Sequence, residues 1–200
     1  MDIRPDVELR GFNTLALPGR AAQFATVTDL DEARVALAFA RERGLAVTVL
    51  GAGSNVVLAG DLPGLLIRVA IRGRALMAQG GDQLELRLGA GEDWHATVEY
   101  SLAQGWYGLE NLALIPGTVG AAPVQNIGAY GVELAQRFVA LEALEIATGA
   151  LRRFDRGECA FGYRDSFFKR AGHDRWLITS VTLALCRTPH LVLDYPALRA

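Results

Sequence analysis

The chain has 200 residues, of which 51% are hydrophobic and 21% are charged, and its formal net charge is -2. This length and apolar content suffice to bury a core in one domain or two small lobes, and the balanced charge excludes the basic excess typical of nucleic-acid-binding proteins. No apolar run approaches the roughly 18 residues of a membrane span, and the N-terminus lacks a signal-peptide pattern. We therefore expect a cytoplasmic protein with neither nucleic-acid nor membrane partners.

The two cysteines, Cys159 and Cys186, are too few for a disulfide framework. No His/Cys cluster has the spacing of a zinc site. We expect two reduced structural thiols and no bound metal.

The first third of the chain predicts the order β-α-β-loop-β. Residues 23–27 alternate as a strand, and a helix opens at Thr28, with carboxylates in its first turn and arginines before Gly44 at its end. Residues 46–50 read as a buried strand, and residues 65–69 form another strand after a Pro-Gly turn.

The remainder predicts a second group of strands and one helix. Leucines alternate with charged residues over 84–88, which is typical of a half-buried strand. A helix follows from its cap Asp93 to Gln104, with Leu102 among its inward residues. Residues 108–131 are rich in Gly, Pro and Asn, whereas 138–146 and 176–186 read as long strands.

The glycine loop, Gly-Ala-Gly-Ser-Asn over 51–55, directly follows the predicted strand 46–50. Glycines let the backbone approach a ligand, and successive N–H groups can form an anion-binding concavity. The loop is not a Walker motif, and it lacks the third glycine of a dinucleotide fingerprint. A phosphate cradle and a plain tight turn both remain open.

Residues 115–131 contain four glycines and two prolines, yet they are too apolar for a solvated linker. Their backbone polar groups need partners. A flat heteroaromatic ligand would suit such a segment, because small side chains allow close approach and backbone amides can meet ring oxygens and nitrogens. A buried structural loop is the alternative.

A third motif, Phe-Gly-Tyr-Arg-Asp-Ser over 161–166, places Arg164 between an aromatic residue and a carboxylate. Such an arginine can be aimed at an anionic substrate, although an ordinary Arg164–Asp165 surface pair is the alternative. We see no Ser/His/Asp arrangement and no carboxylate pair for acid/base catalysis, and we interpret His95 as structural. A bound cofactor would then carry the chemistry.

Four motifs in register resemble one family. The glycine loop, residues 108–117, residues 123–131 and residues 161–166 occur in the order found in the UDP-N-acetylenolpyruvoylglucosamine reductases, also called UDP-N-acetylmuramate dehydrogenases. The resemblance runs from about residue 10 to 196.

The resemblance implies an α+β, two-lobed FAD-binding fold of the vanillyl-alcohol-oxidase type. We expect a first lobe over 1–70, a second over 71–190, and over 191–200 the start of a connection to a substrate-binding domain that is missing. The implied reaction uses non-covalent FAD and NADPH to reduce an enolpyruvyl ether on a UDP-sugar, giving UDP-N-acetylmuramate for peptidoglycan.

The resemblance also implies cofactor contacts. Those expected at the pyrophosphate are Gly51, Ala52, Gly53, Ser54, Asn55 and Val56. Those expected along the flavin and its linkage are Ile115, Pro116, Gly117, Gly120, Ala121, Ala122, Gln125, Asn126, Ile127 and Tyr130.

For catalysis the resemblance implies Arg164, which would stabilise the enolate formed by hydride addition. Tyr163, Arg164 and Tyr195 would bind substrate. The family's proton donor is expected in the missing domain, so this chain alone is expected to bind flavin at best. Another flavoprotein oxidoreductase of the same fold and a non-catalytic flavin-binding module are the alternatives.

Overall fold

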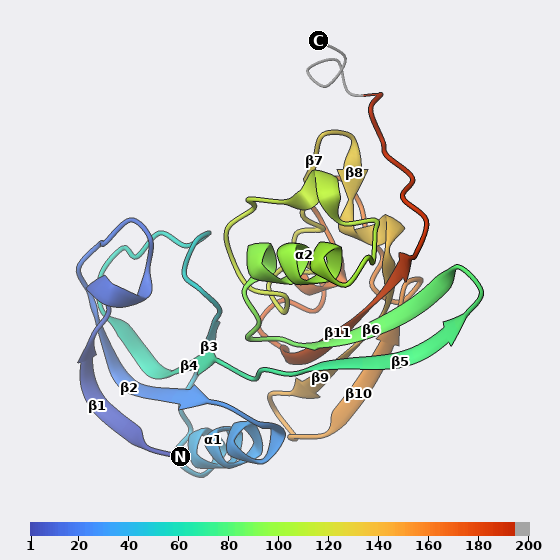
Figure 1. Ribbon diagram of the computed structural model, residues 1–200. Helices are drawn as coiled ribbons and strands as arrows, with labels where there is room; N and C mark the ends of the chain where they lie inside the picture. The colour runs from blue at the N-terminus through green and yellow to red at the C-terminus, as the bar shows by residue number, and fades with distance from the viewer. Residues whose placement is uncertain (195–200) are drawn as a thin grey trace.

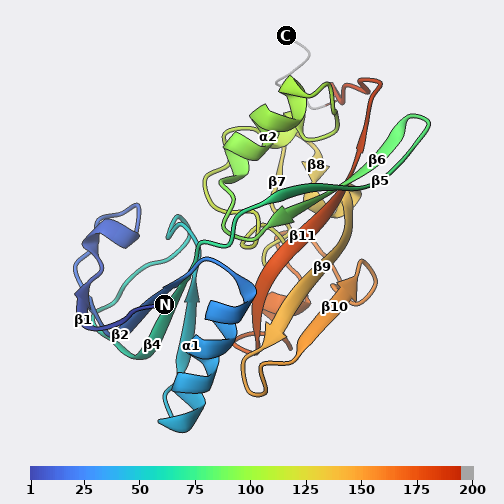
Figure 2. The same cartoon turned by 60° about the horizontal axis from the view of Figure 1, so that its bottom comes forward.

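The computed structural model describes residues 1–194, which form two main β-sheets and a two-stranded ribbon (Figure 1). The first sheet has the order β1-β2-β4-β3 and the second the order β10-β9-β11-β6-β5. Figure 2 shows the sheets side by side, with α1 beside their junction and α2 over the second sheet. Tyr195 lies outside the described residues. Within residues 1–194, neither α-helix is long and apolar enough to cross a membrane.

The first sheet combines antiparallel and parallel pairing. Strand β1 (Ile3–Glu8) lies antiparallel to β2 (Arg20–Val27), whereas β4 (Leu62–Val69) lies parallel to β2 and to β3 (Val47–Leu50). Helix α1 (Leu30–Glu42) connects β2 to β3. The predicted β-α-β order is confirmed, and β1 precedes it.

Helix α1 begins later than its predicted opening. Asp29 is the cap, since its carboxylate accepts a 2.8 Å hydrogen bond from the Glu32 N–H. The Thr28 N–H and hydroxyl instead donate to the Glu32 carboxylate. Both sets of bonds hold the first turn, and the helix therefore starts one residue later than expected.

The prediction of a buried strand at 46–50 is wrong. Strand β3 is the edge strand of its sheet, and Thr48 and Val49 are exposed while Leu50 is buried. An apolar run is compatible with either placement, because periodicity alone does not distinguish a central strand from an edge strand beside a cleft.

The second sheet is antiparallel throughout. Strand β11 (Trp176–Cys186) lies between β9 (Phe138–Glu145) and β6 (Gln83–Gly89), and all three strands were predicted. Strands β5 (Arg74–Gly80) and β10 (Leu151–Asp155) form its edges.

Helix α2 (Trp94–Ala103) begins after its predicted cap, Asp93, whose carboxylate accepts from the Ala96 N–H at 2.8 Å. Its inward face differs from the prediction. Leu102 is 38% exposed, whereas the small Ser101 is fully buried.

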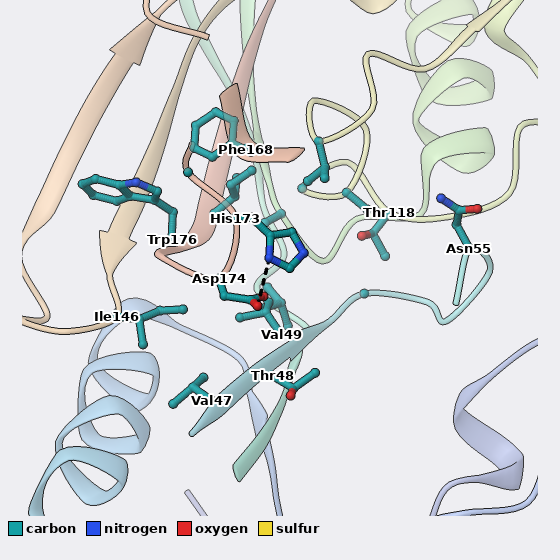
Figure 3. Close-up of a pocket in the computed structure, with 18 of the residues that line it drawn as sticks. Val47, Thr48, Val49, Asn55, Thr118, Ile146, Phe168, His173, Asp174 and Trp176 are labelled. Carbon is teal, nitrogen blue, oxygen red and sulfur yellow. Dashed lines mark ion pairs between the residues drawn. The ribbon is translucent and has the colours of Figure 1, made fainter. Parts of the chain in front are cut away.

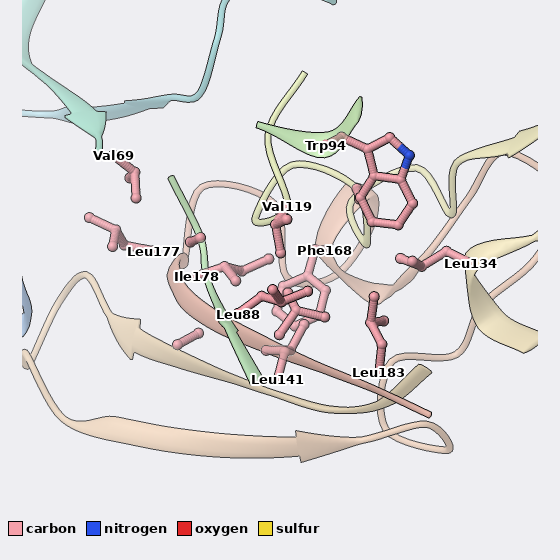
Figure 4. Close-up of a cluster of buried hydrophobic side chains, with 14 of the residues drawn as sticks. Val69, Leu88, Trp94, Val119, Leu134, Leu141, Phe168, Leu177, Ile178 and Leu183 are labelled. Atoms are coloured by element: carbon pink, nitrogen blue, oxygen red, sulfur yellow. The ribbon is translucent and has the colours of Figure 1, made fainter. Parts of the chain in front are cut away.

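One apolar core joins the two sheets (Figure 4). Val69 from the first sheet belongs to the same buried cluster as Leu88, Leu141 and Leu183 from the second. Because both sheets contribute side chains to this one buried cluster, the core, as well as the connecting chain, fixes the position of one sheet against the other.

The irregular segment 108–131 above the second sheet is held in place by hydrogen bonds to backbone carbonyls. The N–H groups of Val119 and Gly120 donate to the carbonyls of Glu92 and Ala90, and the Trp94 indole donates to the Leu112 carbonyl at 2.8 Å. The short elements in and after this region are the 3₁₀ turns Glu110–Leu112 and Leu134–Gln136 and the ribbon β7 (Gly128–Ala129) and β8 (Val132–Glu133).

Candidate functional site

A cleft lies between the first sheet and the irregular segment. It consists of two adjoining hollows of about 340 and 380 Å³. Eight described residues line both hollows: Val49, Gly51, Asn55, Val56, Thr118, Ala121, Val124 and His173. Figure 3 shows the first hollow, with Thr48 and Val49 of β3 facing it. We call the two hollows together the cleft.

The glycine loop forms the first side of the cleft because β3 ends at Leu50 and the chain then turns sharply. Gly53 has φ +71°, and a Cβ there would lie 2.0 Å from the Phe12 carbonyl oxygen. The Thr14 N–H donates to the Gly53 carbonyl at 3.1 Å. The chain after the 3₁₀ turn Arg10–Phe12 therefore closes the loop from behind, and glycine is required at position 53.

The opposite side is the segment 115–125, which approaches the glycine loop closely. A Cβ on Gly51 would lie 2.7 Å from the Thr118 hydroxyl oxygen. Across the cleft, the Asn55 side-chain amide donates to the Gln125 side-chain oxygen at 2.9 Å, although the two residues are 70 positions apart. These contacts set the width of the cleft.

Every predicted cofactor residue except Asn126 and Tyr130 lines the cleft. Asn126 is 1% exposed, and its side chain is occupied within the protein. Its amide donates to Glu133 at 2.8 Å and to the Gly162 carbonyl at 3.0 Å, and its oxygen accepts from the Ala135 N–H at 3.0 Å. The side chain of Asn126 thus lies behind the cleft wall, where it connects three segments of the chain.

Tyr130 lines a third hollow of about 710 Å³ together with Tyr163 and Arg164. This hollow shares Ile115 and Pro116 with the cleft. The hollow lined by Tyr163 and Arg164, which were predicted to bind substrate, therefore adjoins the cleft lined by the predicted cofactor residues.

Arg164 is exposed, has φ +53°, and donates from Nη2 to the Gly128 carbonyl at 2.7 Å. Asp165 pairs with Arg170 at 2.9 Å. The alternative of an Arg164–Asp165 pair is thus not what the structure contains. The bond to Gly128 uses one of the five N–H donors of the guanidinium, and donors of this type also suit an anionic ligand.

Sequence reasoning missed several residues that line the cleft: Thr118, Val124, Lys169, His173 and Asp174. No motif marks the last three, which lie in a loop after the 3₁₀ turn Phe167–Lys169. Only tertiary packing brings this loop to the cleft.

The two thiols do not reach the cleft. Burial, with nearby carboxylates, raises the pKa of Cys159 to about 12, and burial also raises the pKa of Cys186. Both are buried, free cysteines, which agrees with the structural role expected of them. Within the described residues, no group of three or more His, Cys, Asp and Glu side chains is placed to hold a metal ion.

Comparison with known proteins gives a consistent result. A model of the FAD binding domain family matches residues 21–155. The chain is 51% identical over 193 residues to the UDP-N-acetylenolpyruvoylglucosamine reductase of Pseudomonas putida strain KT2440, covering 96% of this chain and 57% of that protein. It is 52% identical over 187 residues to the same reductase of Azoarcus sp. strain BH72, covering 92% and 54%.

Solved structures agree on the fold. The UDP-N-acetylenolpyruvylglucosamine reductase of Thermus caldophilus superposes with a TM-score of 0.74 at 31% identity, covering 92% of this chain and 62% of that one. A solvent-stable cholesterol oxidase superposes with a TM-score of 0.62 at 18% identity, covering 84% and 36%, which shows the fold alone. The predicted α+β FAD-binding fold is confirmed, and the chain spans little more than half the length of the curated relatives it matches.

Proposed function

We propose that this chain, which belongs to the FAD binding domain family, is the flavin-binding part of a UDP-N-acetylenolpyruvoylglucosamine reductase. The observation that carries the proposal is that the cleft and the third hollow meet at Ile115 and Pro116. The cleft is lined by the motifs assigned to the cofactor, and the third hollow is lined by Arg164. The whole reductase would use NADPH to form UDP-N-acetylmuramate, a peptidoglycan precursor.

The residues of the cleft fit FAD. One side offers the backbone of the glycine loop and the side chains of Ser54 and Asn55 to a diphosphate, as an anion-binding concavity requires. The other side, 115–125, offers small apolar residues and backbone amides to a flat ring. A Cβ on Gly51 would press on Thr118 and narrow the space between the two sides. Binding would be non-covalent.

When bound, FAD would supply the redox chemistry, taking a hydride from NADPH and passing one to the β-carbon of the substrate's enolpyruvyl group. Ile115 and Pro116 separate the cleft from the third hollow, so they would set how the ring and the substrate meet. Their apolar character would also keep water from the reacting carbon.

Arg164 would act on the substrate. Hydride addition at the β-carbon leaves negative charge on the α-carbon, delocalised into the carboxylate, and a guanidinium at that position stabilises it. Its bond to the Gly128 carbonyl and the bond from Lys169 to the Arg164 carbonyl, at 3.0 Å, hold it at the rim of the third hollow. Removing one such donor typically lowers a rate by about 100–1,000-fold.

Tyr163 and Tyr130 line the same hollow, where Tyr163 is 84% exposed. Aromatic side chains with a hydroxyl suit a sugar nucleotide, which presents both apolar ring faces and polar groups. We assign Tyr163 to substrate binding, as the sequence suggested, and Tyr195 keeps that role as a prediction. Among residues 1–194 we assign no proton donor for the α-carbon.

The test is spectroscopic. The purified chain is incubated with FAD, desalted, and examined for the visible bands of bound oxidised flavin, after which NADPH is added without oxygen. We expect retained flavin and bleaching of its bands by NADPH. A colourless protein after desalting contradicts the flavin role. Retained flavin that NADPH leaves oxidised favours a different oxidoreductase or a non-catalytic flavin module.

A further inference from the structure

The charged side chains of the cleft all come from one loop. Within residues 1–194, the ionisable groups that line the two hollows are Lys169, His173 and Asp174. The glycine loop and the segment 115–125 line the same hollows with neutral residues only. We call residues 169–174 the cationic loop.

The start of the cationic loop is anchored to the opposite wall. Ser166 caps the 3₁₀ turn, since its hydroxyl oxygen accepts from the Phe168 N–H at 3.2 Å. The same hydroxyl donates to the Val124 carbonyl at 2.7 Å. Lys169 is exposed, and its ammonium donates to the Arg164 carbonyl at 3.0 Å. The ammonium is therefore held beside the cleft by contacts at both ends of its short segment.

His173 lines both hollows, and its imidazole points into the space between β3 and Thr118 (Figure 3). Its Nδ1 lies 2.9 Å from the Asp174 carboxylate. Among residues 1–194, Asp174 is the one carboxylate that lines the cleft, and this contact turns its charge toward the imidazole. Because Nδ1 is engaged, the Nε2 edge is the edge available to a ligand.

The other cations near this loop are occupied away from the cleft. Arg170 pairs with Asp165 at 2.9 Å, and Arg175 pairs with Glu145 at 3.7 Å. Neither arginine lines a hollow of the cleft.

A diphosphate in this cleft would be stabilised by positive charge. Backbone N–H groups, Ser54 and Asn55 provide dipoles, and a nearby cation would further offset the solvation that a negatively charged group loses on leaving water. We propose that Lys169, together with the protonated form of His173, provides this charge and clasps the cofactor's diphosphate from the side opposite the glycine loop. This inference rests on the proposed FAD site, and it assigns the charge to a loop that carries no sequence motif.

The test measures FAD affinity rather than activity. The dissociation constant of FAD is determined by flavin fluorescence for the chain and for Lys169→Gln, His173→Gln, their double variant and Lys169→Arg, at low and at high salt. The matched control is Arg156→Gln, which removes an exposed positive charge outside the hollows.

Each glutamine variant is expected to weaken FAD binding about threefold to tenfold at low salt, since both groups are exposed. The loss should shrink at high salt, because screening weakens exposed charges. Lys169→Arg and Arg156→Gln should bind like the parent chain.

Three results overturn the inference. Unchanged FAD affinity in the double variant removes the role of the loop while leaving the FAD site intact. A loss that persists at high salt, together with a lower melting temperature, assigns the loop a structural role. A parent chain that binds no FAD removes both this inference and the proposed function.

Discussion

The neutral and the cationic parts of the cleft are built in different ways. The neutral part comprises both of its facing walls, the glycine loop and the segment 115–125, and we call it the neutral side. It is fixed by close backbone approach and by buried bonds such as those of the neighbouring Asn126. The cationic loop presents exposed side chains, Lys169 and His173. Substitutions on the neutral side should therefore cost stability and affinity together, whereas those on the cationic loop should cost affinity alone.

The largest effect is expected at Gly53. Gly53→Ala places a Cβ 2.0 Å from the Phe12 carbonyl oxygen at a backbone with φ +71°, so the loop or the chain behind it must move. We expect a loss of at least about 4 kcal/mol in the free energy of unfolding and no detectable FAD binding. Urea denaturation and flavin fluorescence measure the two effects.

Gly81→Ala is the matched control. Gly81 also has a positive φ, +58°, but a Cβ there meets nothing within 4 Å. It should cost about 1 kcal/mol and leave FAD affinity unchanged. If both variants lose the same stability, the contact behind the glycine loop has no energetic weight.

The buried Asn126 and the exposed Asn55 test whether a side-chain amide stabilises the fold or contributes to FAD binding. Asn126→Ala leaves the Ala135 N–H without its acceptor and removes two donated bonds inside the protein, so we expect a loss of about 2–4 kcal/mol. Asn55→Ala removes one bond to Gln125 at an exposed site, and it should change stability by less than about 0.5 kcal/mol while weakening FAD binding. Thermal denaturation and FAD titration of both variants provide the comparison, and equal stability losses contradict it.

Most of the elements that the sequence predicted have clear patterns of burial, and the exposed edge strand β3 is the exception. Strands β6, β9 and β11 alternate or run apolar because the core covers them, and α1 carries both of its end signals. The missed strands include the edge strands β1, β5 and β10, whose side chains are mostly exposed, so they lack a hydrophobic period.

The site divides in the same way. Composition marked the glycine loop and residues 115–131 as possible ligand contacts, because small residues in an apolar context are unusual, and the resemblance to the reductase family then assigned them to the cofactor. Asn126 was assigned to the cofactor, since a sequence does not reveal whether an amide faces a ligand or its own backbone. Lys169 and His173 went unseen because tertiary contacts, such as the bond from Ser166 to Val124, bring their loop to the cleft.

The third prediction concerns the support beneath the neutral side. The Val119 N–H donates to the Glu92 carbonyl, and the Glu92 carboxylate accepts from the Gly73 N–H at 2.9 Å and from Arg74 at 2.8 Å and 3.1 Å. Burial alone would raise the pKa of Glu92, but these bonds outweigh it, so its pKa lies below its usual 4.5. Glu92 thus contributes stability as a carboxylate.

The sign of the pH dependence follows from that direction. A depressed folded pKa gives a contribution that is complete above 4.5, the usual value, and is lost as the pH falls through the lower folded value. Glu92→Gln should lose about 2 kcal/mol at neutral pH, because the Arg74 side chain, which is 27% exposed, stays without its counterion. Chemical denaturation of both proteins from neutral pH into the acid range should show the two stabilities converging below pH 4.5. A constant difference across that range would mean that packing, and not the carboxylate charge, carries the contribution, and the neutral side of the cleft would then have no acid-sensitive support at Glu92.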